Sequence, residues 1–251
     1  MKQIFITTAL GLSLSTGTLT PVLAADITVL ASNGVKAAVT ELVPQFEKET
    51  GHKLHFTWGA SNLLAKQVDA GEAFDIVVLT PVLIKGLTQQ GKVIDGSVTN
   101  LAHVGLGVAV KQGAPKPDIS TVDAFKNTML NAQAIAYTTA GQSGLHFIGV
   151  TEKLGIAEQV KAKGKTIPGG AAAEFVAKGE ADLAIQLIPE LASVSGVDVV
   201  GPFPAELQNY IVLTAGIGTN AKEKAAAQAF IKYLTSPTAI SVIKAKGMEP
   251  G

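Results

Sequence analysis

Short apolar stretches alternate with amphipathic stretches along most of the chain. Residues 26–31 are largely apolar, and Val35, Val39, Leu42 and Phe46 then recur on one face of a helix. The same alternation predicts further strands at residues 54–58, 74–79, 134–138, 165–167, 182–187 and 209–217. It predicts helices at residues 35–50, 63–70, 82–90, 120–131, 145–154, 171–178, 221–234 and 237–246. Mostly apolar strands that alternate with helices indicate a parallel sheet covered on both faces.

Two segments depart from this alternation and predict crossings between two lobes. Residues 103–111 form a long strand that contains glycine and exits through a Pro-rich stretch at 114–117, and residues 197–204 lead back into the strand at 209–217. We therefore predict an α/β protein of two lobes, each a mostly parallel sheet flanked by helices, joined by a two-strand hinge. Lobe I comprises residues 25–108 and 207–251, and lobe II comprises residues 109–206.

The first residues have the pattern of a secretory leader. Lys2 gives a positive start, Ile4 to Leu14 are largely apolar, and Val22-Leu23-Ala24 is a small-residue cleavage pattern. A membrane anchor is the alternative, but Thr and Ser residues interrupt the apolar run well short of the roughly 18 residues that a spanning helix needs. We predict a signal peptide over residues 1–24, cleaved after Ala24 or Ala25, and export to a bacterial periplasm.

Composition narrows the chemistry further. The formal net charge is zero, which gives no general field for nucleic acid, and there is no cysteine for a disulfide, a metal or a nucleophile. The basic side chains are all lysine. Without arginine there is no planar bidentate clamp for a carboxylate or phosphate. Any anion must therefore be held by backbone N–H groups, hydroxyls, amides, lysine or histidine.

Five predicted strands end in turns of small polar residues that lead into helices, three in lobe I and two in lobe II. Such turns leave backbone N–H groups unpaired at the positive end of a helix dipole, where an anion is stabilised. Each turn alone is typical of an ordinary strand-to-helix connection. Because ligands of open α/β sheets lie beyond the carboxyl ends of the strands, we expect the five to converge on one cleft that closes around a small anion. The candidate ligand-binding residues are Ser32, Asn33, Gly34, Ser61, Asn62, Thr80, Gln142, Ser143, Gly144, Gly170 and Gln186.

The four histidines give little evidence of a metal or catalytic site. His52 and His55 are predicted at the surface around a strand start, and their spacing lacks the partners of a zinc motif. His103 and His146 are either polar residues at the ends of elements or groups that transfer protons. We predict no metal site and no cofactor.

The order of these segments resembles a known family. The similarity lies in Ile27-Thr28-Val29-Leu30-Ala31-Ser32, Phe46-Glu47-Lys48-Glu49-Thr50-Gly51, Gly59-Ala60-Ser61, Gly71-Glu72-Ala73-Phe74-Asp75-Ile76 and Gly179-Glu180-Ala181-Asp182, and it covers essentially the whole mature chain. These segments resemble the periplasmic molybdate-binding proteins of ABC transporters and the wider type II solute-binding family. The resemblance implies a two-lobed type II fold, a monomer, a small anionic ligand and an ABC transporter permease as partner. It implies oxyanion binding by Ser32 and Ser61, with backbone donors near Ser143 and Gly170.

One departure from the family leaves the ligand open. Gln186 stands where many molybdate-binding proteins carry a tyrosine, and Thr138-Thr139-Ala140-Gly141 replaces an Asp-Pro pair. A lost aromatic hydroxyl removes a donor and enlarges the pocket, so a larger organic anion becomes an alternative ligand. Several segments also resemble a branch that contains a periplasmic aconitate isomerase, which interconverts trans- and cis-aconitate by an allylic proton shift. In that alternative the candidates for catalysis are His103, His146 and Lys36.

Overall fold

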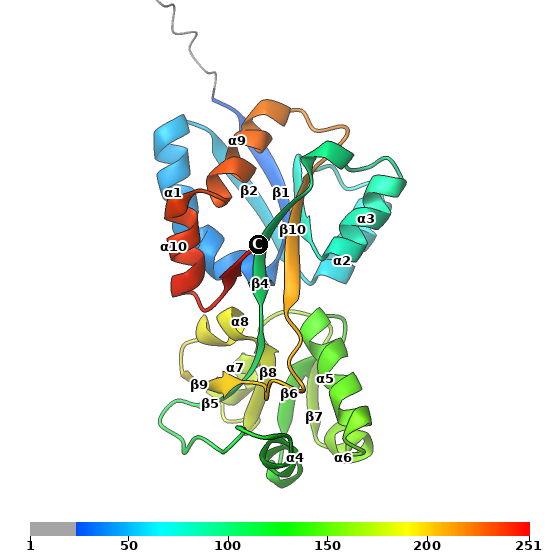
Figure 1. Ribbon diagram of the computed structural model, residues 1–251, viewed down its shortest axis with the longest axis vertical. Coiled ribbons are helices and arrows are strands. Elements are labelled where there is room, and N and C mark those ends of the chain that lie inside the picture. The colour runs from blue at the N-terminus through cyan, green and yellow to red at the C-terminus, as the bar shows by residue number, and fades with distance from the viewer. Residues whose placement is uncertain (1–23) are drawn as a thin grey trace, which may run out of the picture.

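The computed structural model describes residues 24–251 and folds them into two lobes (Figure 1). The predicted two-lobed α/β architecture is confirmed. The predicted signal peptide lies outside the described residues except for Ala24, so it stays a prediction. Within residues 24–251 no helix has the length and apolar character needed to cross a membrane.

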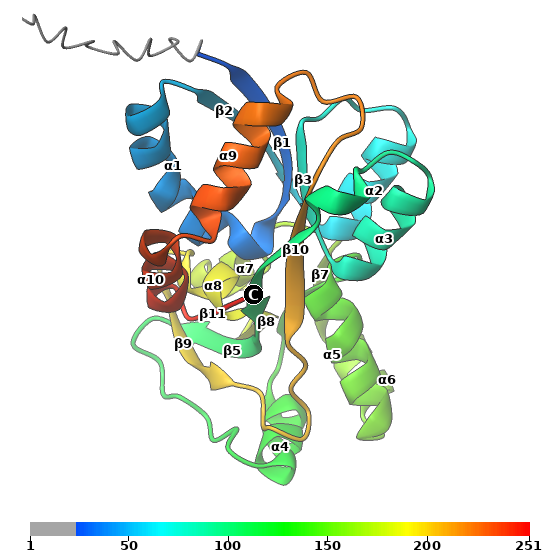
Figure 2. The same ribbon diagram turned by 45° about the horizontal axis from the view of Figure 1, so that its top comes forward.

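Lobe I is built on a six-stranded sheet in the order β11-β4-β10-β3-β1-β2. Its strands are β1 (Asp26–Ser32), β2 (Lys53–Gly59), β3 (Ile76–Leu79), β4 (Thr99–Val104), β10 (Ile211–Ile217) and β11 (Glu249–Pro250). Strands β1, β2 and β3 run parallel, whereas β10 is antiparallel to β3 and β4. Helices α1 (Lys36–Thr50), α9 (Lys224–Leu234) and α10 (Pro237–Ala245) cover one face of this sheet, and α2 (Ser61–Asp69) and α3 (Pro81–Gln89) cover the other (Figure 2).

Lobe II is built on a five-stranded sheet in the order β7-β6-β8-β5-β9. Its strands are β5 (Leu106–Lys111), β6 (Ile135–Thr138), β7 (Gly164–Ile167), β8 (Leu183–Leu187) and β9 (Val197–Pro202). Here β6 is parallel to β7 and β8, and β5 is antiparallel to β8 and β9. Both sheets are therefore mixed rather than mostly parallel, because strands next to the crossings run against their neighbours.

The helices follow the predicted amphipathic stretches closely. They are α1 (Lys36–Thr50), α2 (Ser61–Asp69), α3 (Pro81–Gln89), α4 (Val122–Asn131), α5 (Gln142–Lys153), α7 (Ala173–Ala177), α9 (Lys224–Leu234) and α10 (Pro237–Ala245). Short elements absent from the prediction are η1 (Asn33–Val35), α6 (Ala157–Ala162), α8 (Ile188–Ala192) and η2 (Asp95–Ser97). Elements of three to six residues give too few repeats for an amphipathic period to be recognised.

The crossing between the lobes differs from the single strand predicted over residues 103–111. The chain leaves the first sheet at Val104, turns at Gly105 and enters the second sheet at Leu106. The side chain of Gln208 fixes this turn, since its Oε1 accepts the Leu106 N–H at 2.9 Å and its Nε2 donates to the Leu106 carbonyl at 2.9 Å. Because of this break, one stretch of chain contributes a strand to each of the two sheets: β4 to that of lobe I and β5 to that of lobe II. The residue boundaries of the lobes, 108/109 and 206/207, stay a prediction.

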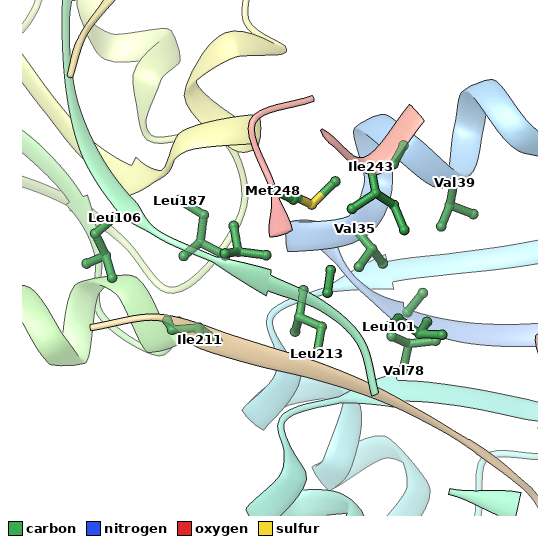
Figure 3. Close-up of a cluster of buried hydrophobic side chains, with 14 of the residues drawn as sticks. Val35, Val39, Val78, Leu101, Leu106, Leu187, Ile211, Leu213, Ile243 and Met248 are labelled. Carbon is green, nitrogen blue, oxygen red and sulfur yellow. The ribbon is translucent and has the colours of Figure 1, made fainter. Parts of the chain in front are cut away.

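A continuous apolar core runs from lobe I across the crossing into lobe II (Figure 3). Leu187, at the end of β8 in lobe II, packs against Gly34 and Leu213 of lobe I. A Cβ on Gly34 would lie only 2.8 Å from the Leu187 methyl carbon, so the absence of a side chain there allows the lobes to approach. The two lobes are thus held in a closed arrangement by apolar contact beside the crossing strands.

Asp75, just before β3, is a buried carboxylate. Its side chain is 6% exposed, and its carboxylate accepts the backbone N–H groups of Thr28, Lys222 and Glu223 at 2.8, 2.8 and 3.2 Å. Asp75 therefore joins three parts of lobe I: the chain just before β3, strand β1, and the segment that precedes α9. Three long-range backbone donors are a feature of tertiary structure that no local pattern reveals.

Candidate functional site

A small cavity, about 20 Å³ in volume, lies between the lobes at the carboxyl ends of β1, β6 and β8. Both lobes contribute to its wall. The lining residues are Ser32, Asn33, Ala60, Ser61, Thr138, Gly141, Gln142, Ser143, Gly169, Gly170, Gln186, Leu187, Glu190, Ile211 and Leu213. This is the position at which open α/β sheets bind ligands.

The lobe I wall is formed by the turns that follow β1 and β2. Ser32 ends β1, and its Oγ accepts the Gly34 N–H at 3.5 Å at the start of η1. Ser61 opens α2 after Ala60, and this helix start has neither a side-chain cap nor an acidic residue in its first turn. Both serines are buried, at 6% and 3% exposed. The free N–H groups of the first turn of α2 and the two hydroxyls thus meet at one wall.

The lobe II wall is formed by the start of α5, which packs directly on the end of β6. Gln142 and Ser143 occupy the first turn of α5, which again lacks a side-chain cap and an acidic residue. A Cβ on Gly144 would overlap the carbonyl oxygen of Thr138, so glycine is required for this close approach. The Thr138 Oγ1 is buried without a hydrogen-bond partner among residues 24–251. A buried hydroxyl that lines a cavity and lacks a partner can donate to a guest.

A second wall of lobe II is the loop before α7, which is fixed by Gln186. Gly170 has φ = +107°, a conformation that favours glycine, and its carbonyl accepts from Gln186 Nε2 at 2.9 Å. Gln186 Oε1 accepts the Ala173 N–H at 3.1 Å. The Gln186 amide is therefore hydrogen-bonded to the backbone of this chain. It forms this part of the wall at the position where many molybdate-binding proteins carry a tyrosine.

Glu190 of α8 also lines the cavity, and it was absent from the residues predicted from the sequence. Burial raises the pKa of its carboxyl to about 7, opposed by hydrogen bonds from the Leu187 N–H and the Gln186 amide. A carboxyl group is unexpected in an anion site, because like charges repel. The sequence analysis missed Glu190 for two reasons. Helix α8 is too short to be recognised from its pattern, and the chain between the end of β8 and α8 has no Gly/Ser turn.

The lobes meet across the cavity through an amide contact. Asn62 Nδ2 donates to the Ala140 carbonyl at 3.2 Å, and Gln142 Nε2 donates to Asn62 Oδ1 at 3.2 Å. Asn62 does not itself line the cavity. Its position joins the starts of α2 and α5, so the two helix ends that face the cavity are held against each other.

The remaining predicted residues lie near the cavity without lining it. Gly34 and Gly144 allow close packing, and Thr80 is the N-cap residue of α3. The seven predicted residues that do line it are Ser32, Asn33, Ser61, Gln142, Ser143, Gly170 and Gln186. Apart from Glu190, the lining residues outside the predicted ligand-binding set are Ala60, Thr138, Gly141, Gly169, Leu187, Ile211 and Leu213. Ala60, Gly141 and Gly169 nevertheless belong to the small polar turns predicted from the sequence.

The residues predicted for catalysis lie away from the cavity wall. His146 Nε2 pairs with the Leu207 carbonyl at 2.8 Å, and His103 lies within β4 opposite Val212. Lys36 is exposed, with its Nζ 5.9 Å from the ring centre of Trp58. In the part of the chain that the structure describes, no group of three His, Asp or Glu side chains could hold a metal ion.

Comparison with known proteins agrees with this fold. The family model of the bacterial extracellular solute-binding proteins matches residues 27–249. The chain is 33% identical over 241 residues to an aconitate isomerase from a Pseudomonas species, which covers 92% of each chain. It is 29% identical over 238 residues to the molybdate-binding protein ModA of Azotobacter vinelandii, which covers 89% of this chain and 90% of the relative.

A solved structure shows the same fold. The periplasmic molybdate-binding protein of Azotobacter vinelandii superimposes with a TM-score of 0.77 at 24% identity, over 90% of this chain and 99% of the other. The resemblance predicted from the sequence segments, to molybdate-binding proteins and to aconitate isomerase, is confirmed by these matches. The chain belongs to the bacterial extracellular solute-binding proteins.

Proposed function

We propose that this protein captures a small anion in the cavity between its lobes and delivers it to an ABC transporter in the inner membrane after export to the periplasm. The observation that carries the proposal is the composition of the cavity wall. Serine hydroxyls from both lobes stand at the starts of α2 and α5, and neither helix start is capped by a side chain. Hydroxyls and free N–H groups at two helix ends form an electropositive lining without a basic side chain.

The geometry favours a guest that accepts hydrogen bonds from several directions. Ser32 and Ser61 act from lobe I, while Ser143, Thr138 and the Gly170 loop act from lobe II. The partnerless Thr138 hydroxyl supports this proposal, because a buried donor without an acceptor is destabilising until a ligand supplies one. A tetrahedral oxyanion or a compact carboxylate has acceptor oxygens in the required directions. The relatives, a molybdate-binding protein and an aconitate isomerase, are named for ligands of these same two classes.

A panel of anions identifies the ligand by its effect on thermal stability. We expect one of molybdate, tungstate, sulfate, phosphate, or di- and tricarboxylates to raise the melting temperature in proportion to the logarithm of its concentration, because a ligand of the folded state stabilises it by mass action. Sodium chloride at matched ionic strength is the control. If every anion in the panel leaves the melting temperature where sodium chloride leaves it, the proposed anion capture is wrong.

Replacing one hydroxyl from each lobe tests the cavity itself. Ser61→Ala and Ser143→Ala are each expected to weaken binding of the stabilising anion by about 1–3 kcal/mol, because the anion loses one donor in a buried site. Ser241→Ala, in the exposed face of α10, is the matched control and should leave the affinity unchanged. Isothermal titration calorimetry measures all three. Wild-type affinity in both cavity variants would exclude these hydroxyls as ligands.

A second candidate function is an aconitate isomerase, and Glu190 is the observation that favours it. Moving the double bond of trans-aconitate requires a base to remove a proton from the methylene carbon and return it to the former vinyl carbon. Glu190 is the ionisable side chain among the described cavity residues, and a carboxyl with a pKa of about 7 can both accept and donate a proton near neutral pH.

The isomerase is tested directly with trans-aconitate and chromatographic separation of the two isomers. If the protein is an isomerase, cis-aconitate accumulates with the wild type, and Glu190→Gln slows its formation by at least about 100-fold, the size of a typical acid–base contribution. Glu180→Gln, at an exposed position, is the control that should retain full activity. Binding of trans-aconitate without conversion at high protein concentration would leave anion capture as the function.

A further inference from the structure

Glu190 sets the charge that the cavity can accept. Among the described residues that line the cavity, it is the one ionisable side chain, in a wall otherwise made of hydroxyls, amides, glycines and apolar groups. An anion that enters this cavity therefore meets a carboxyl group and no cation. The inference below rests on the proposed anion capture.

The hydrogen bonds of Glu190 fix where a proton can reside. Gln186 Oε1 accepts the Ala173 N–H, and Gln186 Nε2 donates to the Gly170 carbonyl, so these backbone partners set the orientation of the amide. The same Nε2 donates to Glu190 Oε2 at 3.1 Å, and the Leu187 N–H points at that oxygen at 3.4 Å. Oε2 is therefore an acceptor, and Oε1 is the oxygen that can carry a proton and donate it to a guest.

In the part of the chain that the structure describes, no charged side chain offsets this carboxyl. Helix α8 packs against β5, β8, β9, η1 and α1. On β5 and β9, Lys111 Nζ lies beside Gly179, and Asp198 accepts the Gly113 N–H. The charged side chains of α1 pair elsewhere or are exposed: Lys36 with Trp58, Glu41 with Lys246, Glu47 with Lys53, Glu49 with Gln45, and Lys48 at the surface.

We propose that the complex of this cavity with an anion holds one proton, shared between Glu190 Oε1 and an oxygen of the anion, and that the anion brings this proton with it whenever the empty cavity is ionised. In the empty protein at pH 8 the carboxyl is ionised and would repel an anion. Protonated, it becomes a hydrogen-bond donor that completes the lining from lobe II. The cavity thereby selects anions according to whether they can accept this hydrogen bond, and binding is coupled to pH.

The sign of the coupling between pH and affinity depends on two pKa values of Glu190. The first is its pKa in the empty protein, and the second is its pKa in the complex with an anion. Burial raises the pKa of Glu190 to about 7 in the empty protein, and a neighbouring anion raises it further, because it disfavours the ionised carboxyl. Below the first pKa the proton is already present and affinity is independent of pH. Above it, each bound anion must take up a proton, so affinity falls about tenfold per pH unit until the pKa of the complex is reached.

The experiment uses calorimetry of the whole protein with two probes, molybdate and trans-aconitate, between pH 6 and pH 9. With whichever probe binds, we expect the wild-type affinity to fall about 50-fold from pH 7 to pH 9, the result of one-proton linkage to a carboxyl whose pKa is about 7 in the empty protein. Glu190→Gln, which keeps an amide donor without a titrating group, is expected to bind equally at pH 6 and pH 9. Glu180→Gln, on the surface, should keep the wild-type slope.

A second measurement requires no variant. Titrations at pH 8 in two buffers of different ionisation enthalpy give the number of protons taken up, which we expect to be close to one per anion. Binding of either probe with zero proton uptake and a flat pH profile would overturn the role of Glu190 and leave anion capture intact. If neither probe binds at any pH and the anion panel is also silent, the proposed function fails, and the inference fails with it.

Discussion

Gly144→Ala is expected to destabilise the protein by about 3 kcal/mol or more and to abolish anion binding. The new Cβ would overlap the carbonyl oxygen of Thr138 and lie 2.9 Å from its Oγ1. A clash with backbone cannot be relieved by a side-chain rotation, so the start of α5 must move away from β6. Because Gln142 and Ser143 lie in that turn, the lobe II donors would leave the cavity with it.

The control for this variant lies in the same helix. Gly149 is exposed in α5, and a Cβ there meets no atom within 4 Å. Gly149→Ala should therefore stabilise the protein slightly, by up to about 1 kcal/mol, through helix propensity alone. Urea unfolding gives the stability of both variants, and calorimetry gives their affinity. Normal binding by Gly144→Ala would show that the close packing of α5 on β6 is dispensable for the site.

Asp75→Ala is expected to lower the free energy of unfolding by about 3 kcal/mol. The substitution leaves the N–H groups of Thr28, Lys222 and Glu223 without their acceptor, in a region where Asp75 is only 6% exposed. Removing a buried acceptor costs more than the net strength of its hydrogen bonds, because the remaining donors stay desolvated. The loss should be confined to stability, since Asp75 does not line the cavity.

Two further variants make this prediction specific. Glu72→Ala, three residues earlier and exposed, should change the urea midpoint very little. Asp75→Asn should fall between the wild type and Asp75→Ala, because its single oxygen can accept from only part of the set. Hydrogen exchange should show faster exchange at Thr28 and Lys222 in Asp75→Ala. Equal stability of Glu72→Ala and Asp75→Ala would contradict the assignment of Asp75 as a structural anchor.

Most of the fold could be predicted because its long elements are regular. The helix that begins at Lys36 and its apolar face at Val39, Leu42 and Phe46 follow a 3.6-residue period over four turns. The strand β1 is buried almost throughout, as its apolar sequence indicates. By contrast, the break at Gly105 was not predicted, because residues 103–111 are uniformly strand-like and only a change of sheet reveals two strands.

The sequence predicted those residues of the candidate site that lie in turns of small polar residues. Ser32, Ser61 and Ser143 line one cavity, as the convergence of strand ends on one cleft suggests. Thr80 does not line it, although it too stands between the end of a strand and the start of a helix. The roles of Ser32, Ser61 and Ser143 in ligand binding stay predictions.

The sequence by itself determined the alternation of strands and helices, the absence of arginine and cysteine, and the small polar turns at the strand ends, since each is local or compositional. Tertiary structure alone decided that a carboxyl, Glu190, lines the cavity between the lobes and that Asp75 is an internal acceptor. The physical reason is that burial and hydrogen bonding depend on partners far apart in the chain. The charge state of a carboxyl follows from those partners, so no run of neighbouring residues can specify it.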